Sequence, residues 1–401
     1  MNYNFRLFWR MAVRSFIGTR NTHGRLTRKR LIFLLLFYTV WPVWAVFTGL
    51  CFWLDDLLFP GYRQQPIEKP LFIIGNFRSG STFLHRLLAR DERTFTSLRT
   101  WDIFITPTIT QRKISALVAR IDQALGSPLK RLLVAIDNRS LGKVRIHRIS
   151  LFEPEEDENI LLHIWSTYFV GFMFPFLDEM PPYIFFDEKL PADEKRRIMG
   201  FYRGCVQRHL YADGGKRHFV AKNPAFSAKI ETLMEFFPDA RVLYLARNPL
   251  EMLPSTVSWL GYAWSVFSDM KEKYPFRDEV LALAKHWYHH PLRYLDAHPS
   301  PNNHILLYNN LIADPEGVIR SFYRQFGYEE HSGLEALIAS AVEETRNYRS
   351  DHRYSYDQMG FTREQILTEF ADIFARFGFE TGETQPLPAL MLEPPVPVAA
   401  D

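Results

Sequence analysis

Hydrophobic and polar positions over the central part of the chain predict strands that alternate with helices. The short apolar runs typical of buried strands are 71–75, 219–222, 241–246 and 305–308. The stretches with helical periodicity include 80–90, 193–212 and 228–237. Strands and helices in alternation predict an α/β protein, a three-layer α/β/α fold with a mostly parallel sheet.

The N-terminal part follows a different pattern. Residues 1–30 are basic, and no acidic residue occurs before Asp55. The apolar run 31–54 would extend roughly 36 Å as a helix, enough for a bilayer core of about 30 Å. It predicts a membrane-associated helix over 31–58 or, because Pro42 lies near its middle, a re-entrant pair of helices.

Charge and cysteine content bear on the compartment. The basic flank is expected to stay on the cytoplasmic side of a membrane. A straight span would place the rest of the chain opposite, in the Golgi lumen for a type II protein, whereas a re-entrant or monotopic segment would leave it in the cytoplasm. Cys51 and Cys205 offer no disulfide framework, so we expect a membrane-associated, cytoplasmic-facing protein. The net charge of +3 does not predict nucleic-acid binding.

Beyond the apolar run, residues 59–380 are expected to form one catalytic or binding domain, and residues 381–401, with five prolines, a mobile tail. Residues 111–136 predict an amphipathic helix with basic residues between its apolar positions. The strongly apolar stretch 159–175 predicts core or the wall of a binding site.

The most informative motif follows the first predicted strand. Gly75-x4-Gly80-Ser81-Thr82 joins this strand to a predicted helix, and such a loop binds phosphate through its backbone N–H groups. Nucleotide triphosphatases carry lysine where this chain has Ser81, and the positive charge of this loop lies at Arg78 instead. The loop therefore predicts a P-loop-type three-layer α/β/α fold and a phosphate-like ligand other than Mg-ATP.

A second motif follows the strand at 241–246. Arg247 ends that strand, and Ser255 lies eight residues further on in the next predicted helix. Because open α/β sheets bind ligands at the carboxyl edge of their strands, this arginine and this hydroxyl can converge on a second phosphate.

Together these motifs resemble the sulfotransferases that use 3′-phosphoadenosine-5′-phosphosulfate (PAPS), in the branch with tyrosylprotein sulfotransferases and many bacterial and membrane-linked members. Three further stretches agree, at 220–224, 308–316 and 352–360, although Asn309 and Asn310 stand where acidic residues are usual. The resemblance implies PAPS as cofactor and 3′,5′-adenosine bisphosphate as product. The cofactor-binding residues it implies are Arg78, Ser79, Gly80, Ser81, Thr82, Arg247, Ser255, Tyr308 and Arg353.

The resemblance also implies a metal-independent reaction, because a sulfuryl group carries less negative charge than a phosphoryl group. Arg78 and Lys222 would then supply positive charge at the transferring group. An acceptor hydroxyl further needs a general base. Glu156, in the acidic run 153–158, is the first candidate and Asp102 the second; Glu155 and His147 remain alternatives. His286, His289 and His290 lack a metal-ligand spacing and predict an amphipathic helix with packed aromatic residues.

The acceptor expected for a membrane-associated enzyme of this kind is a hydroxyl of a lipid, glycolipid or polysaccharide. Two other functions fit some of the pattern. One is a P-loop kinase-like phosphotransferase, which the missing lysine disfavours. The other is a non-catalytic, membrane-tethered nucleotide-binding protein, in which Lys222 would be dispensable.

Overall fold

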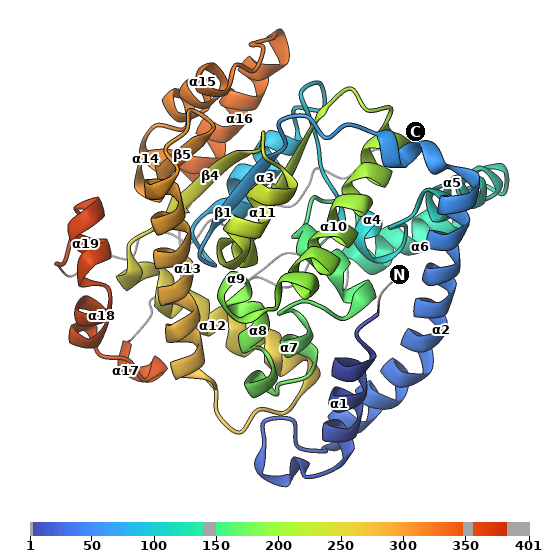
Figure 1. Ribbon diagram of the computed structural model, residues 1–401, viewed down its shortest axis with the longest axis horizontal. Coiled ribbons are helices and arrows are strands. Elements are labelled where there is room, and N and C mark those ends of the chain that lie inside the picture. The colour runs from blue at the N-terminus through green and yellow to red at the C-terminus, as the bar shows by residue number, and fades with distance from the viewer. Residues whose placement is uncertain (1–2, 139–149, 348–355, 383–401) are drawn as a thin grey trace.

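The computed structural model describes residues 3–138, 150–347 and 356–382. Its centre is a five-stranded sheet in which every strand pair is parallel, in the order β2-β3-β1-β4-β5 (Figure 1). The strands are β1 (Leu71–Gly75), β2 (Phe95–Thr96), β3 (His218–Lys222), β4 (Arg241–Ala246) and β5 (Asn303–Leu307). The predicted α/β class and parallel sheet are confirmed; β2 was not predicted, since two residues carry no periodicity.

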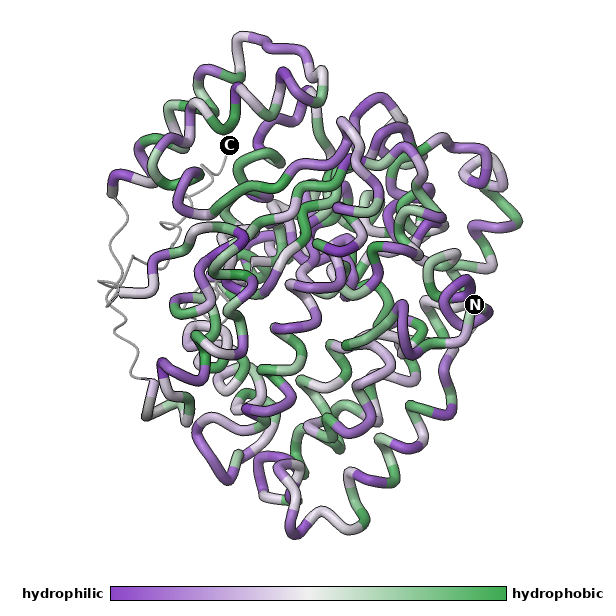
Figure 2. The backbone as a smooth tube through the Cα atoms, turned by 60° about the vertical axis from the view of Figure 1, so that its left-hand side comes forward, coloured by the Kyte–Doolittle hydropathy of each residue, from purple (hydrophilic) through white to green (hydrophobic). Residues whose placement is uncertain are grey.

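Alternate residues of β1 face opposite sides of the sheet and enter two separate cores. Leu71 and Ile73 pack in one core, and Phe72 and Ile74 pack in the other. Both sides are covered by helices, so the strand is buried along its whole length and reads as a continuous apolar run. Figure 2 shows these hydrophobic strands at the centre of the molecule.

Helices form the two outer layers. The layer packed on Leu71 and Ile73 contains α3 (Ser81–Ala89), α15 (Pro315–Phe326) and α16 (Ser332–Asn347). The opposite layer contains α10 (Ala192–Asp213), α11 (Ile230–Phe236), α12 (Pro249–Phe267) and α13 (Arg277–Ala297). The predicted helix at 228–237 begins later than expected because the 3-10 helix η6 (Pro224–Lys229) precedes α11.

The N-terminal apolar run forms one helix, α2 (Arg28–Leu58), with Pro42 inside it. The alternative of a re-entrant pair is therefore wrong. Within the described part of the chain, α2 is the one helix whose length and composition would allow it to cross a membrane. It lies against the rest of the protein beside α1 (Phe5–Phe16), on one side of the molecule (Figure 1).

The predicted helix at 111–136 is two helices, α5 (Ile109–Ala124) and α6 (Pro128–Ile136). The break has a local cause. Gly126 and Ser127 both take positive φ angles, and the Asp122 carboxylate accepts hydrogen bonds from the backbone N–H groups of Leu129 and Lys130 at 2.7 and 2.9 Å. Asp122 thus caps the first turn of α6.

The apolar stretch 159–175 is buried core, as predicted, within η4 (Asp157–Ile164) and α7 (Val170–Met173). The remaining α-helices are α4 (Thr100–Phe104), α8 (Pro181–Ile184), α9 (Phe186–Lys189), α14 (Tyr308–Ala313), α17 (Tyr356–Met359), α18 (Arg363–Glu369) and α19 (Ala371–Phe377). The remaining 3-10 helices are η1 (Thr19–Asn21), η2 (Pro60–Gln64) and η5 (Leu177–Glu179).

Candidate active site

The loop between β1 and α3 has a shape that only glycine permits at two positions. Gly75 has φ +143°, and a Cβ atom there would lie 2.5 Å from the Leu245 carbonyl oxygen. Gly80 has φ +88°, and a Cβ atom there would lie 2.5 Å from Cδ2 of Tyr308. These two glycines let the loop turn tightly and approach β4 and α14 closely.

The loop is equipped for an anion. Ser79 Oγ is buried and has no hydrogen-bond partner among the described residues. Ser81 and Thr82 begin α3, whose N-terminal N–H groups favour negative charge. Arg78 takes a left-handed backbone conformation, and its Nε donates a hydrogen bond to Ser255 Oγ at 3.1 Å. A buried free hydroxyl, a helix N-terminus and an arginine fit a phosphate or phosphosulfate group.

Arg247 lies beside this loop because β4 pairs with β1 in parallel, so both strands end at the same edge of the sheet. Its Nη1 donates to the Arg78 carbonyl oxygen at 2.8 Å, and its Nε donates to Glu251 Oε2 at 3.1 Å. The guanidinium stacks on the ring of Tyr308, 4.1 Å from the ring centroid. Arg78 of the first motif thus meets Arg247 and Ser255 of the second, and Tyr308 from the stretch 308–316 lies against Arg247.

Lys222 and Glu156 form a buried ion pair at the same edge. Lys222 is the last residue of β3, whose register places it opposite Ile73 of β1. Its Nζ donates to Glu156 Oε1 at 2.6 Å, with side chains 1% and 8% exposed. Glu156 lines the cavity of the loop together with Arg78, Ser81 and Arg247. Glu156, the first candidate for the general base, thus lies next to Lys222, the candidate for stabilising negative charge on the transferring group.

The acidic run around Glu156 is mostly buried, although a run of charges is ordinarily solvated. Lys229 pairs with Glu158, and Tyr202 and Asn223 both donate hydrogen bonds to the Asp157 carboxylate. Burial raises the pKa of Asp157 to about 7, although these hydrogen bonds act in the opposite direction. These contacts fix the two residues that follow Glu156 and so help to hold its carboxylate at Lys222.

Asp102 lies elsewhere. It is in the first turn of α4, where its carboxylate accepts the backbone N–H of Arg99 at 3.1 Å and pairs with Arg112 at 3.4 Å. It lines a different cavity, of about 460 Å³, together with His209. The chain turns away after β2, so proximity in sequence to the loop does not bring Asp102 to it. His147 and Arg353 lie outside the described residues.

Four residues of the site did not stand out in the sequence. Phe77 and Trp259 line the loop cavity, with ring centroids 5.0 Å apart. Glu251 orients Arg247, and Tyr288 donates its hydroxyl hydrogen bond to the Arg247 carbonyl oxygen. Only Glu251 carries a sequence signal, because it lies four residues after Arg247 on the helix that Pro249 begins. Tyr288 comes from α13, 41 residues away.

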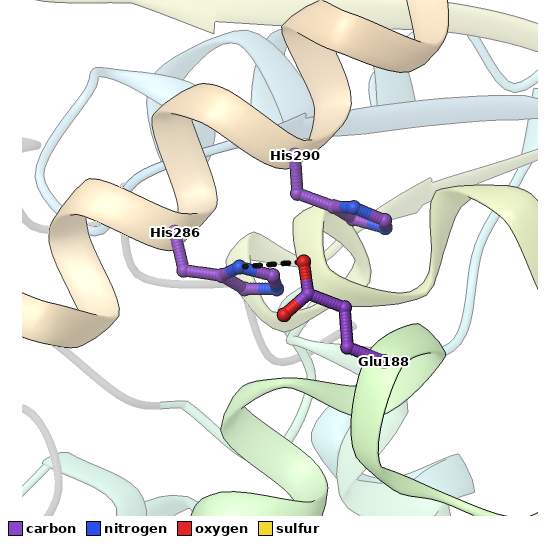
Figure 3. Close-up of side chains that lie close together, drawn as sticks. All are labelled: Glu188, His286 and His290. Carbon is purple, nitrogen blue, oxygen red and sulfur yellow. Dashed lines mark ion pairs between the residues drawn. The ribbon is translucent and has the colours of Figure 1, made fainter.

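Histidines gather at a separate place, between α9 and α13. Ligand atoms of Glu188, His286 and His290 lie within 4.8 Å of one another (Figure 3). Their charges already have partners, since Arg293 pairs with Glu188 at 3.2 Å and His290 Nε2 contacts Asp187 at 3.0 Å. The rings of His286 and His290 stack 5.0 Å apart, so we assign the group a packing role and connect it with no catalytic step.

The comparisons with known proteins agree with this geometry. A sulfotransferase family profile matches residues 70–332, and the chain belongs to this sulfotransferase family. The match begins at β1 and includes the loop, Lys222 and Arg247. Membership favours the sulfotransferase interpretation over the kinase-like alternative.

Individual relatives are distant. The chain is 25% identical over 358 residues to the omega-hydroxy-beta-dihydromenaquinone-9 sulfotransferase Stf3 of Mycobacterium bovis, covering 80% of this chain and 77% of the relative. Among solved structures, sulfotransferase STF9 from Mycobacterium avium matches with a TM-score of 0.68 at 18% identity, over 95% of this chain and 98% of that one. Sulfotransferase STF1 from Mycobacterium tuberculosis matches with a TM-score of 0.59 at 19% identity, over 92% of each chain. These structures support the fold.

Proposed function

We propose that the protein transfers the sulfuryl group of PAPS to a hydroxyl group of a membrane-associated lipid. The observation that carries the proposal is the convergence of three features at the carboxyl edge of the sheet. These are the loop from Gly75 to Gly80, the Arg247 site and the Lys222–Glu156 pair. Two anion sites beside a buried base and cation suit a nucleotide with 3′-phosphate and 5′-phosphosulfate groups.

Two sets of residues would bind the two anionic groups of PAPS. The loop and Arg78 would hold the 5′-phosphosulfate, and Arg247 with Ser255 would hold the 3′-phosphate. Tyr308 already contacts the Arg247 guanidinium with its ring and limits where that guanidinium can lie. The cofactor, when bound, supplies an activated sulfuryl group whose bond to the 5′-phosphate oxygen is broken in the transfer.

Glu156 would act as the general base. Its carboxylate accepts the proton of the acceptor hydroxyl as the oxygen of that hydroxyl forms its bond to sulfur. Lys222 and Arg78 would balance the negative charge on the departing 5′-phosphate, which makes a divalent metal unnecessary. The ion pair at 2.6 Å holds the Glu156 carboxylate and the Lys222 ammonium group at the same point of the site.

A lipid acceptor is supported by two observations. The relative from Mycobacterium bovis is named for a hydroxylated menaquinone, a lipid. The long apolar helix α2 also gives the chain a means of staying at a membrane, where such acceptors dissolve. Glycolipid or polysaccharide hydroxyls are the other acceptor classes of this proposal. The two cysteines are free and buried, which favours a catalytic domain on the cytoplasmic side.

The direct test is calorimetric binding of 3′,5′-adenosine bisphosphate to the full-length protein, purified in detergent without divalent metal, with Mg-ATP as comparator. We expect the bisphosphate to bind and Mg-ATP to bind far more weakly. Arg247→Ala should weaken bisphosphate binding by about 2–5 kcal/mol, because it removes a buried charge-assisted contact.

Arg241→Ala is the matched control, because this buried arginine lies at the opposite end of the same strand and donates to the Phe326 carbonyl oxygen. It should lower thermal stability and leave bisphosphate affinity unchanged. Preference for Mg-ATP, or equal affinity of the Arg247→Ala protein, would overturn the proposal and reopen the kinase-like alternative.

A further inference from the structure

Both ends of α2 are bonded to the folded protein. Near its start, Arg30 is fully buried and donates hydrogen bonds from Nη1 to the carbonyl oxygens of Met173 at 2.5 Å and Phe267 at 3.2 Å. Near its end, Asp55 is fully buried and pairs with Arg208 Nε at 3.1 Å. Asp55 also accepts the backbone N–H groups of the first two residues of α5, both at 2.8 Å.

The middle of α2 is attached as well. Trp44 Nε1 donates to the Phe104 carbonyl oxygen at 3.2 Å, and the ring of Trp41 stacks on His163 with centroids 6.1 Å apart. Arg30 and Asp55 are separated by 25 positions, or roughly 37 Å of helix. Because α2 is bonded to the same domain at both ends, it cannot cross a bilayer while the domain stays on one side. Crossing would require the buried Asp55–Arg208 pair to break.

The outward face of α2 is an apolar stripe. Exposed residues recur every three or four positions, which is the spacing of one helix face. They are Ile32, Leu36, Val40, Val43, Val46, Leu50, Trp53 and Leu57, each between 52% and 73% exposed. The exposed Thr39 also lies on this face, and its hydroxyl donates to the Leu35 carbonyl oxygen at 2.7 Å. An apolar stripe of this length is far beyond the scattered apolar residues of an ordinary surface.

Neighbouring helices on the same side of the molecule extend this surface (Figure 1). On α1, Phe5 and Trp9 are 72% and 67% exposed. On α5 and α6 the exposed apolar residues include Leu117, Ile121 and Leu132. A largely apolar cavity of about 680 Å³ lies between α2, α5 and α6, with Trp44, Phe47 and Val118 among its walls.

The exposed charges of this surface are positive, apart from Asp56 near the end of α2, which pairs with Arg208 at 2.9 Å. Residues 3–54 contain no acidic residue, and the only one within α5 and α6 is the buried Asp122. The exposed cations around the apolar residues are Arg6, Arg10, Arg20, Arg25, Arg28, Lys29, Lys113, Arg120, Lys130 and Arg131. Basic residues around an exposed apolar stripe match the anionic surface and acyl chains of a phospholipid bilayer.

We infer that α1, α2, α5 and α6 form a docking face for an anionic phospholipid bilayer, in which α2 lies parallel to the membrane plane and does not cross it. The apolar stripe enters the boundary between headgroups and acyl chains, and the basic residues contact the phosphates. Binding of this face to a membrane does not depend on the proposed function. Only its role in bringing a lipid acceptor to the site rests on that function.

The test has two measurements on the full-length protein. The first is co-sedimentation with vesicles of phosphatidylcholine alone or with phosphatidylglycerol. Wild type should bind the anionic vesicles at least about tenfold more strongly, and Val43→Glu with Val46→Glu should reduce binding by about tenfold or more. Tyr211→Glu is the matched control, because this residue is 39% exposed on α10, outside the docking face; it should bind like wild type.

The second measurement fixes the topology. Cysteines are introduced on either side of α2, as Asn21→Cys and Gln64→Cys, both at exposed positions, in protein with Cys51→Ala. In sealed vesicles we expect an impermeant thiol reagent to label both from the same side. Protection of one of them until lysis would establish a spanning helix. Failure of wild type to bind anionic vesicles would remove the bilayer as partner. Either result overturns the inference and leaves bisphosphate binding unaffected.

Discussion

Lys222 and Glu156 illustrate how single residues define this site. They are 66 positions apart in the chain and 2.6 Å apart in space, with both side chains buried. A buried pair of this kind is poor evidence for stability, because desolvation offsets most of the attraction. Its position beside the loop cavity suits the proposed function, in which the carboxylate is the base and the ammonium group balances negative charge on the departing phosphate.

Asp157, the next residue, gives a pH prediction. Its pKa is raised from 3.8 to about 7 by burial, so in the native state it keeps its proton between these pH values while the unfolded chain loses it. The free energy of unfolding should therefore fall as pH rises from about 4 to 7, by at most about 4 kcal/mol from this group. Above pH 7 Asp157 is ionised in both the native and the unfolded state, so it adds no further pH dependence to the free energy of unfolding.

Asp157→Asn should remove this part of the pH dependence, because the amide cannot ionise and can still bond Tyr202 and Asn223. The measurement is urea unfolding of both proteins at pH 5 and pH 8. The difference between the two pH values should be smaller in the variant. An equal difference would show that Asp157 titrates normally.

At the scale of elements, the strand–loop–helix unit predicts a specific effect of glycine replacement. Gly80 and Gly214 have nearly identical backbone angles, φ +88° and ψ 2° against φ +89° and ψ 2°. A Cβ atom at Gly80 would meet the Tyr308 ring at 2.5 Å, whereas Gly214 has no atom within 4 Å. Alanine at either position introduces the same backbone strain, about 1–3 kcal/mol.

We therefore expect Gly80→Ala and Gly214→Ala to lose similar thermal stability from strain, with an additional loss at Gly80 from the clash. Only Gly80→Ala should weaken binding of 3′,5′-adenosine bisphosphate, by about tenfold or more, because Tyr308 and the loop must separate. Calorimetry and thermal denaturation on both proteins check this. Equal affinities would mean that the loop does not hold the nucleotide.

The same elements show what the sequence could predict. β1 and β4 have the predicted bounds, because a strand buried on both faces is a continuous apolar run that breaks sharply at Gly75 and Arg247. The break between α5 and α6 was missed because apolar periodicity continues through it. The burial of Glu155 to Glu158 was equally hidden, since their partners at 202, 222, 223 and 229 come from elements far along the chain.

At the scale of the whole molecule, the site and the docking face depend on contacts between distant parts of the chain. The sequence predicts that residues 31–58 prefer an apolar environment, but not that Arg208 and Met173 fix the ends of α2 to the domain. It likewise ranks Asp102 close to Glu156 as a base, because nothing local shows that α4 turns Asp102 into another cavity. Contacts between distant parts of the chain show that α2 is bound to the domain and that Glu156, not Asp102, lies at the loop cavity.

The central claim is sulfuryl transfer from PAPS to a lipid hydroxyl with Glu156 as base. The decisive measurement incubates the full-length protein with sulfur-35-labelled PAPS and a membrane lipid extract, then separates lipids from water-soluble products. Label should appear in the lipid fraction. Glu156→Gln should lower its rate of appearance by about 10²-fold or more, and Asp102→Asn should stay within about twofold of wild type. Label confined to water-soluble protein, or activity lost in Asp102→Asn and kept in Glu156→Gln, would contradict the account.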